Sequence, residues 1–236
     1  MVNMSAQFDP TDKILVLDFD HNCYDTDAFL LFEIRDAMIN KWNIPIPAWQ
    51  EAYERATKIG YTLEVHREEL VRILKYEPFT LKEIQDFEKN IDFSKYLYSD
   101  VSLFIAKAKE RRYKMMLLSF GEPSWQDKKV KGVGFDKIMD VIKFTKEEGS
   151  KAEILAKYVK DCTKVVFVEN NGLDLDAVFK TLPQVDTYFM NRVPIEAMSP
   201  EKNEFIRIRY DESREIAMRK IVFEHKRINS FEEIVL

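Results

Sequence analysis

The feature that most constrains the fold is an apolar run near the start of the chain that ends in acidic residues. Residues Lys13–Asp20 read KILVLDFD, in which Ile14–Leu17 is continuously apolar. A strand that is apolar on both faces is typical of a parallel sheet covered by helices on both sides. The run ends in Asp18 and Asp20, and open α/β sheets bind ligands at the carboxyl ends of their strands. The sequence therefore predicts a buried first strand with two carboxylates at the ligand-binding edge.

The second half of the chain alternates short apolar runs with helical patterns. Strands are expected at Lys114–Ser119, Val141–Phe144, Lys164–Val168 and Thr187–Met190, and helices at 99–112, from Ser124, at Lys151–Val159 and at Asp174–Lys180. This alternation predicts a parallel sheet with helices packed against it. In the tail, Glu204–Tyr210 is a candidate strand and Glu212–Arg219 a candidate helix.

The segment between the first two strands carries only helical patterns. Helical spacing of apolar residues predicts helices over Ala28–Trp42, Pro47–Ile59 and Glu64–Tyr76, and Thr80 with Glu83 is a capping-box signature for a fourth. We therefore expect an α/β, Rossmann-like core from residues 1–25 and 98–236, with an inserted helical cap domain at 26–97.

Composition excludes several classes of function. The 236 residues include 36 Lys and Arg against 41 Asp and Glu, a net charge of −5 that argues against a broad nucleic-acid-binding surface. No apolar run approaches the roughly 20 residues of a membrane span, and the first ten residues do not resemble a signal peptide. Cys23 and Cys162 are isolated, as in proteins of a reducing compartment. We expect a cytoplasmic protein that binds neither nucleic acid nor membranes; its oligomeric state stays open.

Polar residues follow three of the expected strands. Besides Asp18 and Asp20, Ser119 ends the strand that begins at Lys114, and Glu169 with Asp174 follows the strand that begins at Lys164. A lysine between the last two, Lys151 or Lys146, could join them. Because parallel strands end at one edge of the sheet, these residues are expected to form one site.

These motifs resemble those of the haloacid dehalogenase-like (HAD) hydrolase superfamily, in its phosphatase-type form with a helical C1 cap. The matching segments are DFDHNCYDTD from Asp18, MMLLSFG with Ser119, GSKAEIL with Lys151, and VVFVENNGLD with Asp174. The resemblance covers residues 12 to 192, and the helical insertion lies where C1 caps lie. The set of four motifs is specific, although each of them is short.

The resemblance implies an aspartyl-phosphate mechanism. Asp18 is the expected nucleophile, while Asp20 protonates the leaving oxygen and later activates water. Ser119 is expected to hydrogen-bond a phosphoryl oxygen and Lys151 to neutralise its charge, with Lys146 as the second choice. The expected substrate is a small phosphorylated metabolite, which the motifs do not identify.

The resemblance also implies Mg²⁺ as the cofactor. Asp18, the main-chain carbonyl of Asp20, and Asp174 are its expected ligands. The sequence departs from the family at Asn170, a neutral residue where an acidic one is usual, and the adjacent Glu169 is expected to supply the missing carboxylate.

Two further functions fit the motifs. A phosphomutase of the same superfamily also keeps both aspartates. A catalytically weak, non-enzymatic binding protein on this fold would explain Asn170 together with His21 and Asn22, which stand where the family usually has glycine and threonine or valine. The basic run of Lys128, Lys129 and Lys131 is interpreted as a solvated helix end.

Overall fold

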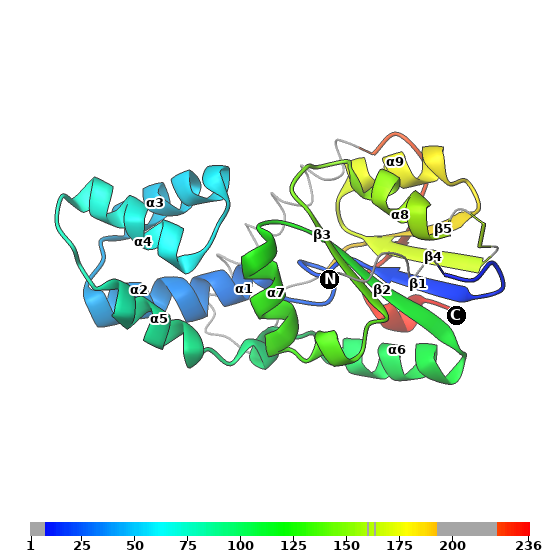
Figure 1. Cartoon of the computed structure of the whole chain (residues 1–236), viewed down its shortest axis with the longest axis horizontal. Helices are drawn as coiled ribbons and strands as arrows, with labels where there is room; N and C mark the ends of the chain where they lie inside the picture. Colours follow the sequence, from blue (N-terminus) through cyan, green and yellow to red (C-terminus); the bar gives the residue numbers. More distant parts are fainter. Residues whose placement is uncertain (1–7, 160, 163, 193–220) are drawn as a thin grey trace, which may run out of the picture.

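A computed structural model, which describes residues 8–159, 161–162, 164–192 and 221–236, contains a sheet of six parallel strands (Figure 1). Their order across the sheet is β3-β2-β1-β4-β5-β6. The strands are β1 (Lys13–Leu17), β2 (Tyr113–Phe120), β3 (Val141–Thr145), β4 (Lys164–Glu169), β5 (Val185–Met190) and β6 (Lys226–Ile228). This confirms the predicted Rossmann-like α/β fold, in which β1 lies centrally between β2 and β4.

Alternate residues of β1 pack against opposite helical layers. Leu15 and Leu17 share a buried cluster with residues of α6 (Ser99–Glu110) and α7 (Pro123–Gly132). Ile14 and Val16 share the second cluster with α8 (Lys151–Val159) and α9 (Gly172–Thr181). Figure 1 shows α8 and α9 on one face of the sheet and α6 on the other. Burial on both faces explains why the strand reads as a continuous apolar run.

The helical insertion, residues 26–97, forms the part of the molecule at the left of Figure 1. Its elements are α1 (Thr26–Ala28), a π-helical segment (Phe29–Arg35), α2 (Asp36–Trp42), α3 (Ile46–Ile59), α4 (Leu63–Leu74), α5 (Leu81–Lys89) and a short 3₁₀ helix (Phe93–Tyr96). Thr80 and Glu83 form the reciprocal hydrogen bonds of a capping box at the start of α5, as their spacing predicted. Trp42 stacks on Phe79 with ring centroids 4.2 Å apart, which packs the insertion's own core.

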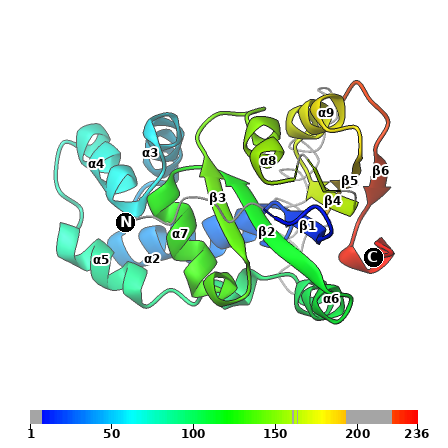
Figure 2. The same cartoon turned by 45° about the vertical axis from the view of Figure 1, so that its right-hand side comes forward.

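The end of the chain returns to the edge of the sheet. Strand β6 pairs in parallel with β5, and the chain then passes through a 3₁₀ turn, Phe231–Glu233, to its end (Figure 2). Strand β6 was not predicted, because Lys226 and Arg227 interrupt any apolar pattern. The candidate strand at 204–210 and helix at 212–219 lie outside the described residues.

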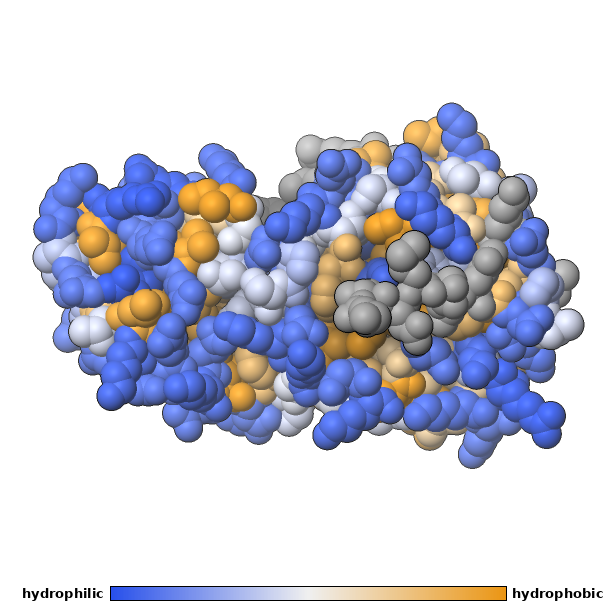
Figure 3. Space-filling view, in the orientation of Figure 1, coloured by the Kyte–Doolittle hydropathy of each residue, from blue (hydrophilic) through white to orange (hydrophobic). Residues whose placement is uncertain are grey.

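The face shown in Figure 3 is largely hydrophilic, with small apolar patches on both the insertion and the sheet domain. Among the residues that the structure describes, no helix has the length and apolar character needed to cross a lipid bilayer.

Candidate active site

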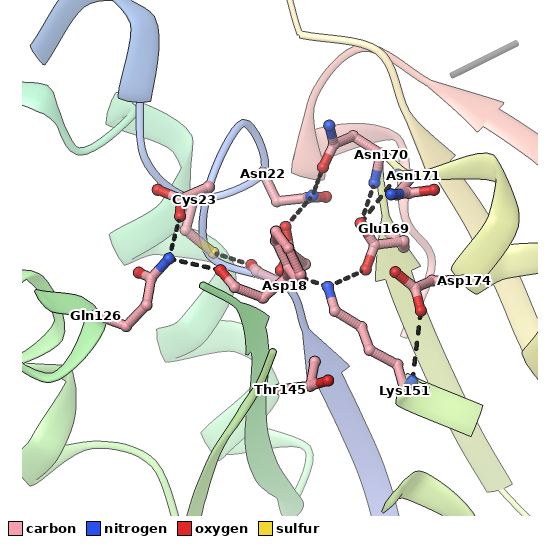
Figure 4. Close-up of polar contacts among 12 residues, drawn as sticks. Asp18, Asn22, Cys23, Gln126, Thr145, Lys151, Glu169, Asn170, Asn171 and Asp174 are labelled. Carbon is pink, nitrogen blue, oxygen red and sulfur yellow. Dashed lines mark hydrogen bonds and ion pairs between the residues drawn. The ribbon is translucent and has the colours of Figure 1, made fainter. Parts of the chain in front are cut away.

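Asp18 occupies the first position after β1. Its main-chain N–H donates to the Val168 carbonyl oxygen of β4 at 3.1 Å, so the sheet fixes its backbone. Only 3% of the residue is exposed. A buried carboxylate needs partners for both of its oxygens, and here the two oxygens have different partners (Figure 4).

Lys151, the first residue of α8, holds one of these oxygens. Its Nζ lies 2.7 Å from Asp18 Oδ1 and 2.5 Å from Glu169 Oε2. Burial disfavours the ammonium form, but the carboxylates of Asp18, Glu169 and Asp174 outweigh this and raise the pKa of Lys151 above its usual value. Lys146 instead pairs with Glu122 at 2.9 Å with its side chain 64% exposed. Of the two candidate lysines, the structure therefore brings Lys151 to Asp18.

Glu169 and Asp174 lie around Lys151. Glu169 Oε1 accepts the main-chain N–H groups of Asn170 and Asn171, both at 2.9 Å, while Oε2 contacts Lys151. Burial, with the neighbouring charge of Asp18, raises the pKa of Glu169 to about 8. Asp174 Oδ1 accepts the main-chain N–H of Lys151 at 3.4 Å, and burial raises the pKa of Asp174. Both oxygens of Glu169 thus have partners within the protein, as both oxygens of Asp18 do.

Asn22 holds the second oxygen of Asp18. The Asn22 side chain is fully buried, and its Nδ2 lies 3.1 Å from Asp18 Oδ2 and 2.9 Å from the side-chain amide of Asn170. Asn22 therefore connects Asp18, the candidate nucleophile, to Asn170, the neutral residue at a position where the sequence motif predicts a carboxylate. The sequence marked Asn22 only as a departure from the family pattern.

The contacts of Asn170 test whether a metal ion fits. One terminal atom of its amide lies 2.9 Å from Asn22 Nδ2 and 3.2 Å from both Glu169 Oε1 and the Asp20 main-chain oxygen. As an oxygen this atom faces two other oxygens, and as a nitrogen it faces the Asn22 nitrogen. A small cation beside an Asn170 oxygen removes the conflict, because hard cations bind carbonyl, amide and carboxylate oxygens.

The oxygens that the structure brings together there are those of Asn170, the Asp20 main chain and Glu169 Oε1. Only one of these three oxygens belongs to a carboxylate side chain. Accordingly, within the described part of the chain no group of three or more His, Cys, Asp or Glu side chains is arranged to hold a metal. The residues present fit Mg²⁺ with less negative charge than the sequence motif predicted.

A buried arginine fixes the Asn22 backbone. Arg192 Nε donates to the Asn22 carbonyl oxygen at 2.8 Å, and Arg192 Nη1 lies 2.7 Å from Asp100 Oδ2. The guanidinium packs over the rings of Tyr98 and Phe231, with 4.3 and 4.8 Å to the ring centroids. Sequence reasoning missed Arg192, because it lies 170 residues from Asn22 in the chain.

Asp20 has a different set of donors, two from α7 and one from α1. Lys129 Nζ lies 2.5 Å from Asp20 Oδ1, Gln126 Nε2 donates to Oδ2 at 2.6 Å, and the Thr26 hydroxyl donates to Oδ1. Burial opposes ionisation of Asp20, but the charge of Lys129 and these three donors outweigh it and lower the pKa of Asp20.

The interpretation of Lys129 as part of a solvated helix end was wrong. Lys129 is only 2% exposed, whereas Lys131 in the same run pairs with Asp127 at the surface. On α7 the residues Trp125, Gln126, Lys129 and Val130 are buried together. Their spacing of one, three and four residues marks one helical stripe, and this phase could have identified Lys129 from the sequence.

Ser119 lies near the end of β2, next to β1. It is completely buried, and among the described residues its Oγ has no hydrogen-bond partner. Buried hydroxyls are normally paired, so an unused donor at this strand end suits an incoming oxyanion. Ser119 itself is not among the residues that line the cavity between the insertion and the sheet domain, whereas the next two residues, Phe120 and Gly121, are.

A cavity of about 460 Å³ lies between the insertion and the sheet domain. Asp18, Asp20, Lys129 and Lys151 line it on the side of the sheet domain, and Tyr53, Lys58 and Tyr61 line it from the insertion. The candidate catalytic groups therefore share one cavity with residues of both parts. The sequence placed the acidic groups at this edge but gave no signal for the cavity walls.

Comparisons with known proteins identify the fold. A candidate haloacid dehalogenase-like hydrolase from Burkholderia xenovorans matches with a TM-score of 0.68 at 15% identity, over 94% of each chain. This is a HAD-like fold. The candidate HAD hydrolase YfnB from Bacillus subtilis, bound to magnesium, matches with a TM-score of 0.56 at 15% identity, over 94% of this chain and 96% of that one.

The same HAD-like fold occurs in L-2-haloacid dehalogenase from Xanthobacter autotrophicus, whose structure has chloropropionic acid covalently bound. That match has a TM-score of 0.54 at 17% identity and covers 94% of this chain and 96% of that one. No protein-family model and no curated protein matches the sequence. These likenesses establish the fold, and the chemistry has to be argued from the site.

Proposed function

We propose that this protein is a magnesium-dependent phosphomonoester hydrolase that acts on a small phosphorylated metabolite through an aspartyl-phosphate. One observation carries the proposal. The buried Asp18 carboxylate is held by Lys151 on one oxygen and Asn22 on the other, and it lines the cavity; Ser119, whose hydroxyl has no partner among the described residues, lies near the end of the adjacent strand β2. A fixed carboxylate beside a cation and a free donor is what attack on a phosphoryl group needs.

In the first half-reaction, an Asp18 oxygen bonds to phosphorus while the bond from phosphorus to the leaving oxygen breaks. Lys151 and Ser119 stabilise the charge on the phosphoryl oxygens. The leaving oxygen takes a proton from the pair formed by Lys129 and Asp20, in which the proton lies on Lys129 Nζ, 2.5 Å from Asp20 Oδ1. This differs from the sequence expectation, because the contacts of Asp20 favour its carboxylate form.

In the second half-reaction, water attacks phosphorus and releases phosphate from Asp18. The Asp20 carboxylate accepts the proton of that water and passes it to Lys129 Nζ, 2.5 Å away, which restores the pair for the next turnover. Asp18, the Asp20 main-chain oxygen, Glu169 and Asn170 would hold Mg²⁺, which when bound offsets the repulsion between the carboxylate and the phosphate. The helical insertion serves as the cap that forms one wall of the cavity.

The proposal is tested by phosphate release from 4-nitrophenyl phosphate and a panel of phosphorylated metabolites, with Mg²⁺ and with a chelator. Acid quenching should trap a phosphoenzyme in the unaltered protein. Asp18→Asn should form none and should lose turnover, with folding checked by circular dichroism. Undiminished phosphatase activity in folded Asp18→Asn contradicts the mechanism.

Other activities of this fold are separate arms of the same experiment. Chloride release from 2-chloropropionate without phosphate release from any ester would instead indicate a dehalogenase. Transfer of the trapped phosphoryl group to a sugar phosphate would indicate a phosphomutase.

A further inference from the structure

The cavity between the insertion and the sheet domain has an apolar part that the proposed chemistry does not use. The apolar side chains that line it are Phe29, Leu30, Tyr53, Ile59, Tyr61, Phe120 and Trp125. Phosphoryl transfer itself needs only the polar end, formed by Asp18, Lys151 and their neighbours. The apolar side chains are therefore available to contact the rest of a substrate.

Two of these side chains lie outside the hydrophobic clusters of the described residues. Ile59, the last residue of α3, is 63% exposed, and Phe120, the last residue of β2, is 44% exposed. Neither belongs to the two buried clusters or to the residues packed against them in the described structure. Trp49, by contrast, is 5% exposed and lies inside the main cluster. Exposed apolar side chains that line a cavity gain free energy when a ligand covers them.

Aromatic rings form the wall between the insertion and the sheet domain. Tyr61 of the insertion meets Trp125 of α7 edge to face at 5.6 Å, and Tyr53 meets Tyr61 at 5.3 Å. The Tyr61 hydroxyl hydrogen-bonds His66 Nδ1 at 3.2 Å, which holds its ring in place. A wall of fixed rings favours a flat apolar group, since ring edges and faces attract one another in stacked and edge-to-face arrangements.

We propose that the substrate is a phosphomonoester of an alcohol that carries an aromatic ring, and that Phe120 and Ile59 contact that ring from the sheet domain and the insertion. This inference rests on the proposed phosphomonoesterase function and names its class of leaving group. The cavity volume of about 460 Å³ accommodates a phosphoryl group with one or two rings.

Binding is measured first, without turnover. Calorimetric titrations with benzylphosphonate and methylphosphonate, in the presence of Mg²⁺, compare two non-hydrolysable ligands that differ by one ring. We expect benzylphosphonate to bind at least about tenfold more tightly, as burial of one ring typically contributes. Phe120→Ala and Ile59→Ala should each reduce this ratio about three- to tenfold and leave methylphosphonate binding unchanged.

A matched control lies on the same helix as Ile59. Ile46, at the start of α3, is 57% exposed and does not line the cavity. Ile46→Ala should leave the ratio of the two dissociation constants unchanged. Because all three side chains are exposed, the variants should fold, which circular dichroism verifies.

Turnover is then compared between benzyl phosphate and ethyl phosphate, whose alcohols have similar acidity, so that leaving-group reactivity does not produce the difference. A higher kcat/KM for benzyl phosphate, lost in Phe120→Ala, supports the proposal. Equal kcat/KM values in an active phosphatase, or equal affinity for the two phosphonates, overturn it. Preferential binding of benzylphosphonate without turnover of any ester supports the aromatic subsite and contradicts only the proposed hydrolysis.

Discussion

Lys129 Nζ lies 2.5 Å from Asp20 Oδ1, and this buried lysine also packs over the rings of Phe19 and Tyr24 at 5.4 and 5.8 Å. The ion pair keeps Asp20 charged on the wall of the cavity. It also joins α7 to the loop after β1, so that one contact serves both the fold and the proposed proton transfer. Its removal should therefore change catalysis and stability together.

Lys129→Met should raise the pKa of Asp20, because the largest influence that favours the carboxylate is lost while burial remains. The acid limb of the pH profile of kcat/KM should then move to higher pH, and kcat should fall about 10²–10⁴-fold. Lys131→Met, which removes an exposed lysine of the same helix, should leave the profile in place. An unshifted acid limb in Lys129→Met would contradict the assignment.

The ion pair of Lys129 and Asp20 should also make the free energy of unfolding depend on pH. Because the folded-state pKa of Asp20 is lowered, its contribution is present above the unfolded pKa of about 3.9 and is lost as the pH falls through the folded value. The free energy of unfolding should therefore fall less steeply below about pH 4 in Lys129→Met than in the unaltered protein. Urea denaturation at several pH values measures this difference.

Lys151→Met should destabilise the protein by about 3–5 kcal/mol, because it leaves three buried carboxyl groups around an uncharged side chain. Lys146→Met, at an exposed pair, should change the free energy of unfolding by less than about 0.5 kcal/mol. Urea unfolding of the two variants makes the comparison. Loss of turnover in folded Lys146→Met, with Lys151→Met still active, would assign the phosphate-binding role to Lys146.

Glu169 should make the protein less stable as the pH rises. Its folded-state pKa of about 8 is above the unfolded value of about 4.3, so its contribution is fully present below the unfolded value and is lost as the pH rises to about 8. Glu169→Gln should make the free energy of unfolding less dependent on pH in this range. Identical slopes in the two proteins between pH 5 and 8 would show that Glu169 titrates normally.

Magnesium should raise the melting temperature, since a cation bound only by the folded state stabilises it. Asn170→Asp restores a carboxylate next to the Asp20 carbonyl and should lower the dissociation constant of Mg²⁺ about tenfold or more. Differential scanning calorimetry at increasing Mg²⁺ tests this independently of activity. Asn170→Ala removes the side-chain oxygen and serves as the matched control. If Mg²⁺ raises the melting temperature equally in all three proteins, the metal binds elsewhere.

The sequence predicted β1 to β5 because each is a mostly apolar run between helical patterns. It failed at β6, whose three residues include Lys226 and Arg227, and which forms because β5 offers a free edge. It identified Asp18 and Lys151, which the structure brings together, because both stand in short motifs. Arg192 was missed because its partner, the Asn22 carbonyl, lies 170 residues away. Lys129 was missed because the basic run was assigned to the exposed side of α7, against the helical spacing that groups it with the buried residues.

The Arg192 contact has a consequence for the order of events during synthesis. Chains grow and generally fold from the N-terminus, so the loop with Asp18 and Asn22 leaves the ribosome long before Arg192. Arg192 is itself packed against Phe231, whose main-chain N–H donates to the same Asp100 oxygen at 2.7 Å. A nascent chain that has not yet released Arg192 and Phe231 would therefore lack this contact to the Asn22 backbone, and the proposed activity should arise only after both residues have emerged.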